Sequence, residues 1–185
     1  MNIRPYCDKD RSDVRYICLF CDGPEDMSEG TQHFILTTYC DYYIEKEKHN
    51  CFVAADDSDK AIGYVICSES FDSFIDAFEK EYLPRIPAEE KQYRTFAEES
   101  TVFQKKYKSI YPAHLHIGIL PEYQRMGIGH KLLDTLISHL REKGISGVML
   151  TVNAENKKGI AFYEKYGFTL IEKGHSEAAF GMTLA

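Results

Sequence analysis

Hydrophobic and polar positions follow a helical period most clearly in the second half of the chain. Apolar residues return every three or four positions over residues 128–140, which predicts an amphipathic helix. Lys143-Gly144 is a natural C-terminal stop for that helix. The run from Leu115 to Leu120, just before it, reads as a strand. The apolar positions of the helix are Ile128, Leu132, Leu133, Leu136, Ile137 and Leu140.

Other segments show the same alternation of strand and helix patterns. Residues 147–152 are a short apolar run rich in β-forming residues, and Gly159 to Tyr166 reads as a short helix closed by Gly167. In the first half, two apolar runs flank an Asp/Ser turn and read as a hairpin, Cys51 to Ala55 and Ala61 to Cys67. Together these segments predict an α/β protein.

Residues 69–111 form an unusually long connection between the third and fourth predicted strands. Its apolar residues recur at helical spacing until Pro84 and Pro87 interrupt the pattern. A connection of this length usually has a function or carries its own structure. Three interpretations stay open: a helical lid over an acceptor site, a flap that covers apolar sheet surface, and a dimer surface. The helically spaced residues are Phe71, Phe74, Ile75, Phe78 and Tyr82.

Two glycines, Gly127 and Gly129, fall where the strand turns into the helix. The first N–H groups of a helix have no intrahelical partner, and the helix dipole is positive there, so this turn suits a phosphate or pyrophosphate. The dinucleotide fingerprint needs a third glycine where this chain has Leu132, and the P-loop needs Gly-Lys-Ser/Thr where it has Gly-His-Lys. A glycine-containing helix start without a ligand is the alternative.

The remaining pattern, Gln124-x-x-Gly127-x-Gly129, resembles the pyrophosphate-binding motif of the GNAT superfamily of acetyl-CoA-dependent N-acetyltransferases. A second segment, Asn156 followed by the run from Ala161 to Phe168, resembles the second signature of the same family. The resemblance implies a mixed, strongly twisted central sheet flanked by helices. Its fourth and fifth strands would be splayed. The helical insertion over residues 69–111 would lie between the third and fourth strands, where the compact family core has a tight connection. Residues 3–6 and a helix from about Asp10 to Cys21 are similar to the family's opening strand and first helix.

The segment from Tyr111 to Ile117 resembles one subgroup, which is related to the acetyltransferase-like domain of O-GlcNAcases. That subgroup continues with Asp where this chain has Gly118. An acid/base role therefore cannot be carried over from that Asp. The substitution keeps open an alternative function, an acyl-CoA-binding sensor or pseudo-enzyme without transferase activity.

The resemblance also implies a site for acetyl-CoA. The pantetheine arm would lie between the splayed strands and pair with the backbone of Ile117 and Ile119. Asn156 would hydrogen-bond the cofactor arm, although a helix N-cap is an equally compatible role for it. The pyrophosphate would lie on the turn formed by Gln124, Arg125, Met126, Gly127, Ile128, Gly129 and His130.

Transfer to an amine needs a proton donor for the leaving thiolate and an amine that is neutral when it attacks. Tyr163 matches the tyrosine that serves as general acid in the family, whereas helical spacing alone also fits a core aromatic. His116 is a candidate base, because its ordinary pKa is near 6.5, and a hydrogen-bonded structural role is the alternative. Glu69 and an ordered water are other candidates. Asp41, Tyr42 and Tyr43 are candidates for lining the acceptor pocket.

Composition narrows the class of protein further. A chain of 185 residues with 44% hydrophobic and 28% charged residues suits one α/β domain over residues 1–185. It has neither an apolar stretch near the ~20 residues of a membrane span nor a signal-type N-terminus, so we expect a cytoplasmic protein without a membrane partner.

All six cysteines fall in the first 67 residues, which is not the distribution of a disulfide framework. Cys18-x-x-Cys21 is only formally a redox or zinc half-site.

The net charge of −7 disfavours a nucleic-acid partner. Residues 1–68 carry 7 basic and 13 acidic side chains, whereas residues 112–185 carry 8 and 7, which suits an anionic cofactor and a cationic amine. The sequence therefore predicts an N-acetyltransferase that acts on a primary amine of a small molecule by direct attack in a ternary complex. We expect no metal, and a monomer or homodimer. A cysteine hydrolase that uses Cys51 or Cys67 with His116 lacks a nucleophile elbow.

Overall fold

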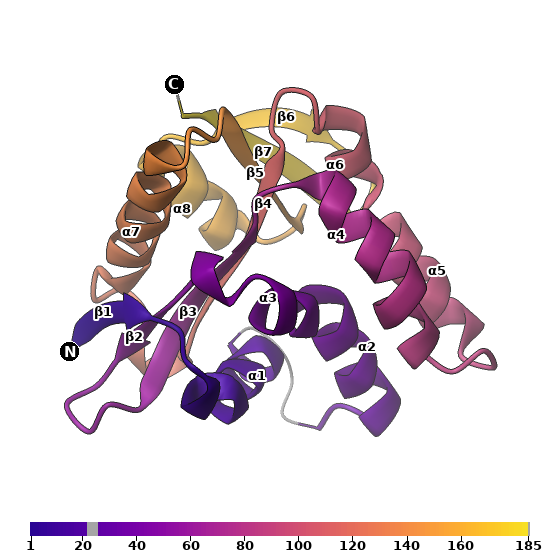
Figure 1. The fold of residues 1–185 in the computed structure, drawn as a ribbon, viewed down its shortest axis with the longest axis horizontal. Coiled ribbons are helices and arrows are strands. Elements are labelled where there is room, and N and C mark those ends of the chain that lie inside the picture. Colours follow the sequence, from indigo (N-terminus) through magenta and orange to yellow (C-terminus); the bar gives the residue numbers. More distant parts are fainter. Residues whose placement is uncertain (22–25, 185) are drawn as a thin grey trace.

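The computed structural model describes residues 1–21 and 26–184. Its centre is a seven-stranded mixed sheet in the order β1-β2-β3-β4-β5-β7-β6 (Figure 1). Neighbouring strands are antiparallel except β4 and β5, which are parallel. This confirms the predicted α/β fold. The strands are β1 (Asn2–Pro5), β2 (Cys51–Ala55), β3 (Ala61–Ser68), β4 (Ala113–Ile119), β5 (Gly147–Asn153), β6 (Thr169–Lys173) and β7 (Glu177–Thr183).

Helices cover both faces of the sheet. One face carries α7 (Ile128–Glu142) and α8 (Lys157–Tyr166), and all six apolar positions predicted for α7 are buried. Burial of each such side chain stabilises the fold by about 1.5–3 kcal/mol. The other face carries α1 (Arg11–Phe20), α2 (Glu29–Tyr39), α3 (Asp41–Lys46) and α4 (Phe71–Ala77). Strand residues alternate between the two cores: Tyr64 and Ile66 belong to the α1–α4 side, Val65 and Cys67 to the α7–α8 side.

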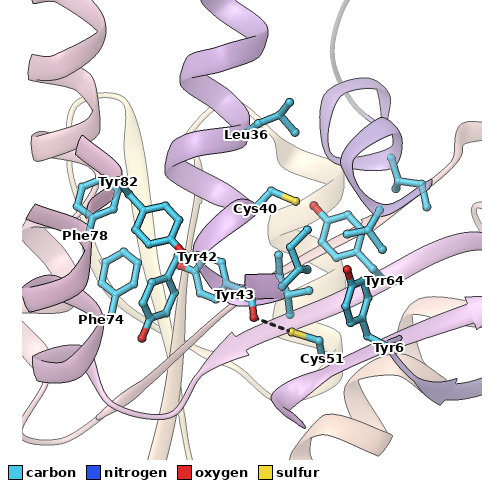
Figure 2. Close-up of a cluster of buried hydrophobic side chains, with 14 of the residues drawn as sticks. Tyr6, Leu36, Cys40, Tyr42, Tyr43, Cys51, Tyr64, Phe74, Phe78 and Tyr82 are labelled. Carbon is cyan, nitrogen blue, oxygen red and sulfur yellow. Dashed lines mark hydrogen bonds between the residues drawn. The ribbon is translucent and has the colours of Figure 1, made fainter. Parts of the chain in front are cut away.

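The core on the α1–α4 side is rich in tyrosine and phenylalanine. Figure 2 shows Tyr42 and Tyr43 of α3 lying against Phe74 of α4. Tyr42 also meets Tyr82 at a ring-centroid distance of 5.6 Å. Phe74 and Tyr82 belong to the 69–111 insertion, so the insertion contributes to the core of the protein.

The insertion is helical, as its spacing predicts. It contains α4, a π-helical turn at Phe78–Tyr82, a 3₁₀ turn at Leu83–Arg85, α5 (Lys91–Glu99) and α6 (Val102–Tyr107). Helix α5 lies beside α2 in Figure 1. There Tyr93 stacks on Phe34 with centroids 5.3 Å apart, and its hydroxyl is 2.7 Å from Oγ1 of Thr31. The insertion is thus attached to the α2 side of the molecule.

Strands β4 and β5 form a fork. They pair only at Ala113–Val148 and His114–Met149. Beyond these pairs β4 continues to Ile119 and β5 to Asn153, while β5 stays paired with β7 along its whole length. The predicted splay of the fourth and fifth strands is therefore present, and it opens toward the C-terminal ends of both strands. Among the described helices, none is both long and apolar enough to cross a membrane.

Candidate active site

The turn before α7 has the geometry of an anion-binding helix start. Arg125 and Gly127 both have left-handed backbone conformations, with φ of 63° and 78°. Gly127 is the N-cap and provides no side chain to occupy the first amides of α7. Residues 124–127 are exposed, and a Cβ added to Gly127 would meet no heavy atom within 4 Å. Amides at the positive end of a 15-residue helix thus face open space, which fits a pyrophosphate.

The side chain of Gln124 holds this turn in place. Its Nε2 donates hydrogen bonds to the carbonyl oxygens of Ile119, at 3.0 Å, and Cys21, at 3.2 Å. These bonds join the turn to the end of β4 and to the end of α1. Nε2 of Gln124 thus fixes the backbone of the turn, and a contact from Gln124 to the pyrophosphate remains a prediction.

The backbone of β4 directs hydrogen-bonding groups into the fork, and of these the carbonyl of Ile119 accepts from Gln124. The N–H of Leu120 donates to the carbonyl of Ile62 on β3. In an antiparallel ladder such pairs alternate, so Gly118 and His116 also direct their backbone groups at β3. Ile117 and Ile119 direct theirs to the other side, where β5 has diverged. The structure thus provides the strand edge that the sequence predicts for the pantetheine arm.

Asn156 is the N-cap of α8. Its Oδ1 accepts a hydrogen bond of 2.9 Å from the N–H of Gly159. The capping role is therefore present. A contact from the same residue to the cofactor remains a prediction, and the two are compatible because the cap uses only Oδ1.

Tyr163 lies on the α7–α8 side of the sheet. It is half-buried on α8, with its ring 5.3 Å from that of Phe162 and 6.0 Å from that of Phe168. Ile117 and Ile119, which border the fork, pack against the same core as Tyr163. Tyr163 is thus a core aromatic on the face of the sheet to which Ile117 and Ile119 also contribute, and its position beside the thioester remains a prediction.

His116 lies on the opposite face of the sheet from Tyr163. Its Nε2 is 3.0 Å from the hydroxyl of Tyr43, and its ring meets that of Tyr39 edge-on at 5.4 Å. Burial lowers the pKa of His116 to about 4. At neutral pH His116 is therefore uncharged and a weak base. Tyr43, one of the three residues predicted to line the acceptor pocket, is therefore in contact with His116.

His114 lies two residues before His116 on β4 and points to the same face of the sheet. It is 2% exposed, and neither ring nitrogen has a hydrogen-bond partner among the described residues. Burial, with a smaller contribution from His116, lowers its pKa to about 3. Both histidines border a cavity of about 10 Å³, which is room for about one water molecule.

Glu69 is placed away from the fork opening. The neighbouring Ser68 pairs with His114, at the closed end of the fork. The carboxylate of Glu69 forms an ion pair with Lys143 and accepts a hydrogen bond of 2.9 Å from Asn50. Burial raises its pKa, but Lys143 and Asn50 outweigh burial and leave that pKa below its ordinary value. The position and the ion pair both argue against Glu69 as the base.

The remaining predicted polar residues have structural partners. Asp41 forms an ion pair with Arg15, and the hydroxyl of Tyr42 donates to Glu47 at 2.6 Å. None of the six cysteines is in a disulfide bond. Cys51 and Cys67 are buried, and burial raises the pKa of both thiols, which removes the thiolate that a cysteine hydrolase would need.

A strand fork beside an anion-binding helix start defines a class of proteins, those that bind an acyl-coenzyme A along a strand edge. The chain belongs to the acetyltransferase (GNAT) family, whose model matches residues 19–168. This confirms the family recognised from the two motifs and its cofactor, acetyl-CoA.

Individual relatives agree with this assignment. The ribosomal protein bS18-alanine N-acetyltransferase of Escherichia coli strain K12 is 43% identical over 53 residues, which are 29% of this chain and 36% of that protein. The crystal structure of SsHAT superposes with a TM-score of 0.89 at 25% identity, over 100% of this chain and 98% of the other. The coenzyme A complex of PaiA N-acetyltransferase from Thermoplasma acidophilum gives 0.60 at 18% identity, over 98% of each chain, and shows the fold alone.

Proposed function

We propose that this protein transfers an acetyl group from acetyl-CoA to a primary amine of a small molecule, by direct attack in a ternary complex. The observation that carries the proposal is the fork between β4 and β5. The backbone groups that Ile117 and Ile119 direct away from β3 and the open amides before α7 border this fork, and the carbonyl of Ile119 already accepts from Gln124. Residues 125–130 would hold the pyrophosphate, with Gln124 and Asn156 fixing the turn and the start of α8.

Acetyl-CoA supplies an acetyl carbon that bonds to the amine nitrogen as its carbon–sulfur bond breaks. Tyr163 gives the proton of its hydroxyl to the leaving sulfur, and the proton that the nitrogen loses after attack balances that transfer. His116 remains in the proposal as an uncharged residue that positions Tyr43, because a pKa of about 4 makes it a weak base at neutral pH.

The packing of the insertion on the face of the sheet that carries α2 supports a small-molecule acceptor. Phe74 of the insertion is 4.6 Å from His114, ring to ring, and Gln104 and Ser100 border the same small cavity. These contacts narrow the space beside β4, and a narrow pocket suits a small amine better than an extended peptide. The O-GlcNAcase-related subgroup and the cytoplasmic location stay predictions that rest on the sequence alone.

Space at Gly118 bears on the sensor alternative. A Cβ added there would lie 2.9 Å from the ring of Tyr64 and 3.2 Å from Sγ of Cys21. An Asp side chain at 118 would therefore need these groups to move, and because residue 118 is glycine the base must be another side chain or an ordered water.

An acceptor screen tests the proposed function. Calorimetry first measures acetyl-CoA binding, and release of coenzyme A is then followed with small primary amines and, in parallel, with histone-tail peptides. We expect acetyl-CoA to bind and at least one small amine to be acetylated, with little activity on the peptides. Turnover of lysine peptides alone would contradict the small acceptor. Binding without any transfer would establish the sensor, and absence of binding would contradict the proposal as a whole.

A further inference from the structure

The two arms of the fork present a common face toward α2 and the insertion. Because β4 and β5 are parallel and pair at His114–Met149, His116 and Thr151 occupy corresponding positions two residues farther along the arms. Val148, Leu150 and Val152 belong to the core on the α7–α8 side. Thr151 therefore points to the other face, the one that carries His116.

Glu177 lies on this same face. It pairs with Asn153 across β5 and β7, while the next residue, Ala178, belongs to the α7–α8 core. Alternation along β7 then directs Glu177 to the face of Thr151. The side chain is half-buried at the start of β7, beside the open end of the fork.

Tyr39 connects Glu177 to His116 across the opening. Its ring is edge-on to His116 at 5.4 Å. Burial raises the pKa of Tyr39, the nearby Glu177 carboxylate raises it further, and the Ser100 hydroxyl of the insertion lowers it. Tyr39 is thus close enough to Glu177 for an electrostatic interaction between the two side chains. A carboxylate, aromatic rings and a hydroxyl thus lie on one face of the sheet near the fork, which is a chemical environment that suits a cation.

Among the described residues no cation neutralises Glu177; the buried Glu47 also lacks one, but Tyr42, Asn50 and Ser68 donate hydrogen bonds to its carboxylate. Asp10 is paired with Arg4 at 2.7 Å, Glu45 with Arg85 at 3.0 Å, and Glu69 with Lys143. Among residues 1–21 and 26–184, none forms an ion pair with Glu177. Burial raises the pKa of Glu177, and the neighbouring Thr151 hydroxyl opposes this only in part. A half-buried carboxylate is costly when a single hydroxyl is its partner and no cation neutralises it, and a bound ammonium group would supply the missing charge.

We propose that Glu177 binds the ammonium group of the acceptor at the open end of the fork and accepts one of its protons. The proposal rests on the transferase function above and adds the acceptor class: an amine that arrives protonated, such as an alkylamine or a polyamine. The ammonium loses one proton to the carboxylate, which becomes a carboxylic acid, and the resulting neutral amine carries the lone pair that attack requires. Tyr39 and His116 border the acceptor, and Thr151 positions the carboxylate.

The acceptor's own charge gives a test that a structural role of Glu177 would not mimic. Benzylamine and spermidine are protonated near neutral pH, whereas aniline is neutral and needs neither an anionic partner nor deprotonation before attack. Wild type, E177Q, E177D and the control E142Q are compared with each amine. Glu142 is an exposed residue at the end of α7. Acetyl-CoA affinity is measured separately for each variant by calorimetry.

We expect E177Q to lower kcat/KM for benzylamine and spermidine by about 10²-fold or more, while aniline changes by less than about threefold. E177D, which keeps the charge, should retain more activity than E177Q, and E142Q should match wild type. Acetyl-CoA affinity should be the same in all four proteins. An equal loss with aniline, or no loss with the protonated amines, overturns the role of Glu177. A wild type that binds acetyl-CoA but acetylates none of the amines overturns the transferase itself and this role with it.

Discussion

Gly129 of α7 lies so close to Phe162 of α8 that a Cβ added to Gly129 would fall 2.9 Å from Cζ of Phe162. The second glycine of the motif is thus required where the two helices pack. Gly129→Ala should lower the free energy of unfolding by about 1–3 kcal/mol through overpacking. Phe162→Leu should lower the free energy of unfolding less in the Gly129→Ala protein than in wild type. We expect a difference of at least about 0.5 kcal/mol, measured by urea unfolding. Strictly additive effects would show that the contact is not the cause.

Gly127 is required for a different reason, its left-handed backbone. Gly144, at the other end of α7, has nearly the same φ, 71° against 78°, and an added Cβ meets nothing within 4 Å at either site. Gly127→Ala and Gly144→Ala should each cost about 1–2 kcal/mol of stability. Only Gly127→Ala should weaken acetyl-CoA binding, by about tenfold or more, because Gly127 belongs to the turn whose amides face the proposed pyrophosphate and Gly144 does not. Calorimetry on both variants separates the effects, and equal affinities would remove the turn from the site.

Tyr163→Phe keeps the ring in the α8 core and removes the proton donor. If Tyr163 protonates the leaving sulfur, kcat should fall by about 10²-fold while acetyl-CoA affinity stays within a few-fold. Tyr166→Phe is the matched control: the hydroxyl of Tyr166 on the same helix donates to Asp134 at 2.9 Å, so its loss should affect stability more than turnover. A kcat within about threefold of wild type in Tyr163→Phe would leave Tyr163 as a core aromatic only.

The elements with a strong period could be predicted from the sequence, and contacts between distant segments could not. Helix α7 follows from its apolar spacing, and the anion-binding turn from two glycines at a strand-to-helix junction. Local pattern also identified Asn156, although it could not choose between cap and ligand. Glu177 and Tyr39 were missed, because only the fold brings β7 and α2 to the fork. A lone Glu at a strand start has no local signal; an alternation of apolar residues from Ala178 onward is the single hint that it faces away from the α7–α8 core.

The buried histidines predict a pH dependence of stability. Burial lowers the folded-state pKa of His116 to about 4, below the ordinary value of 6.5 that applies in the unfolded chain. The unfolded chain therefore binds more protons between these values, and the free energy of unfolding should fall as the pH drops from about 6.5 toward 4. His116→Asn should flatten this slope, while His33→Asn, at an exposed position of α2, should leave it unchanged. Identical slopes in all three proteins would show that His116 is solvated.

The insertion can be assigned as a lid or a flap by loosening one hydrogen bond. Tyr93→Phe keeps the stack on Phe34 and removes the 2.7 Å hydrogen bond to Thr31 of α2, at a cost of about 0.5–1.5 kcal/mol. α5 leads directly to Ser100, which borders the Tyr39 and His116 cavity. A shift of α5 should therefore reach the proposed acceptor site and not the 124–130 turn. We expect KM for the amine to rise several-fold with kcat and acetyl-CoA affinity unchanged.

Tyr107→Phe serves as the control. It removes a 2.5 Å hydrogen bond from α6 to Glu172 of β6, so it loosens the insertion at a different place. If both variants have a lower melting temperature and an unaltered KM, the insertion is a flap that covers apolar sheet surface. If either variant changes the sedimentation coefficient, the insertion is part of a dimer surface.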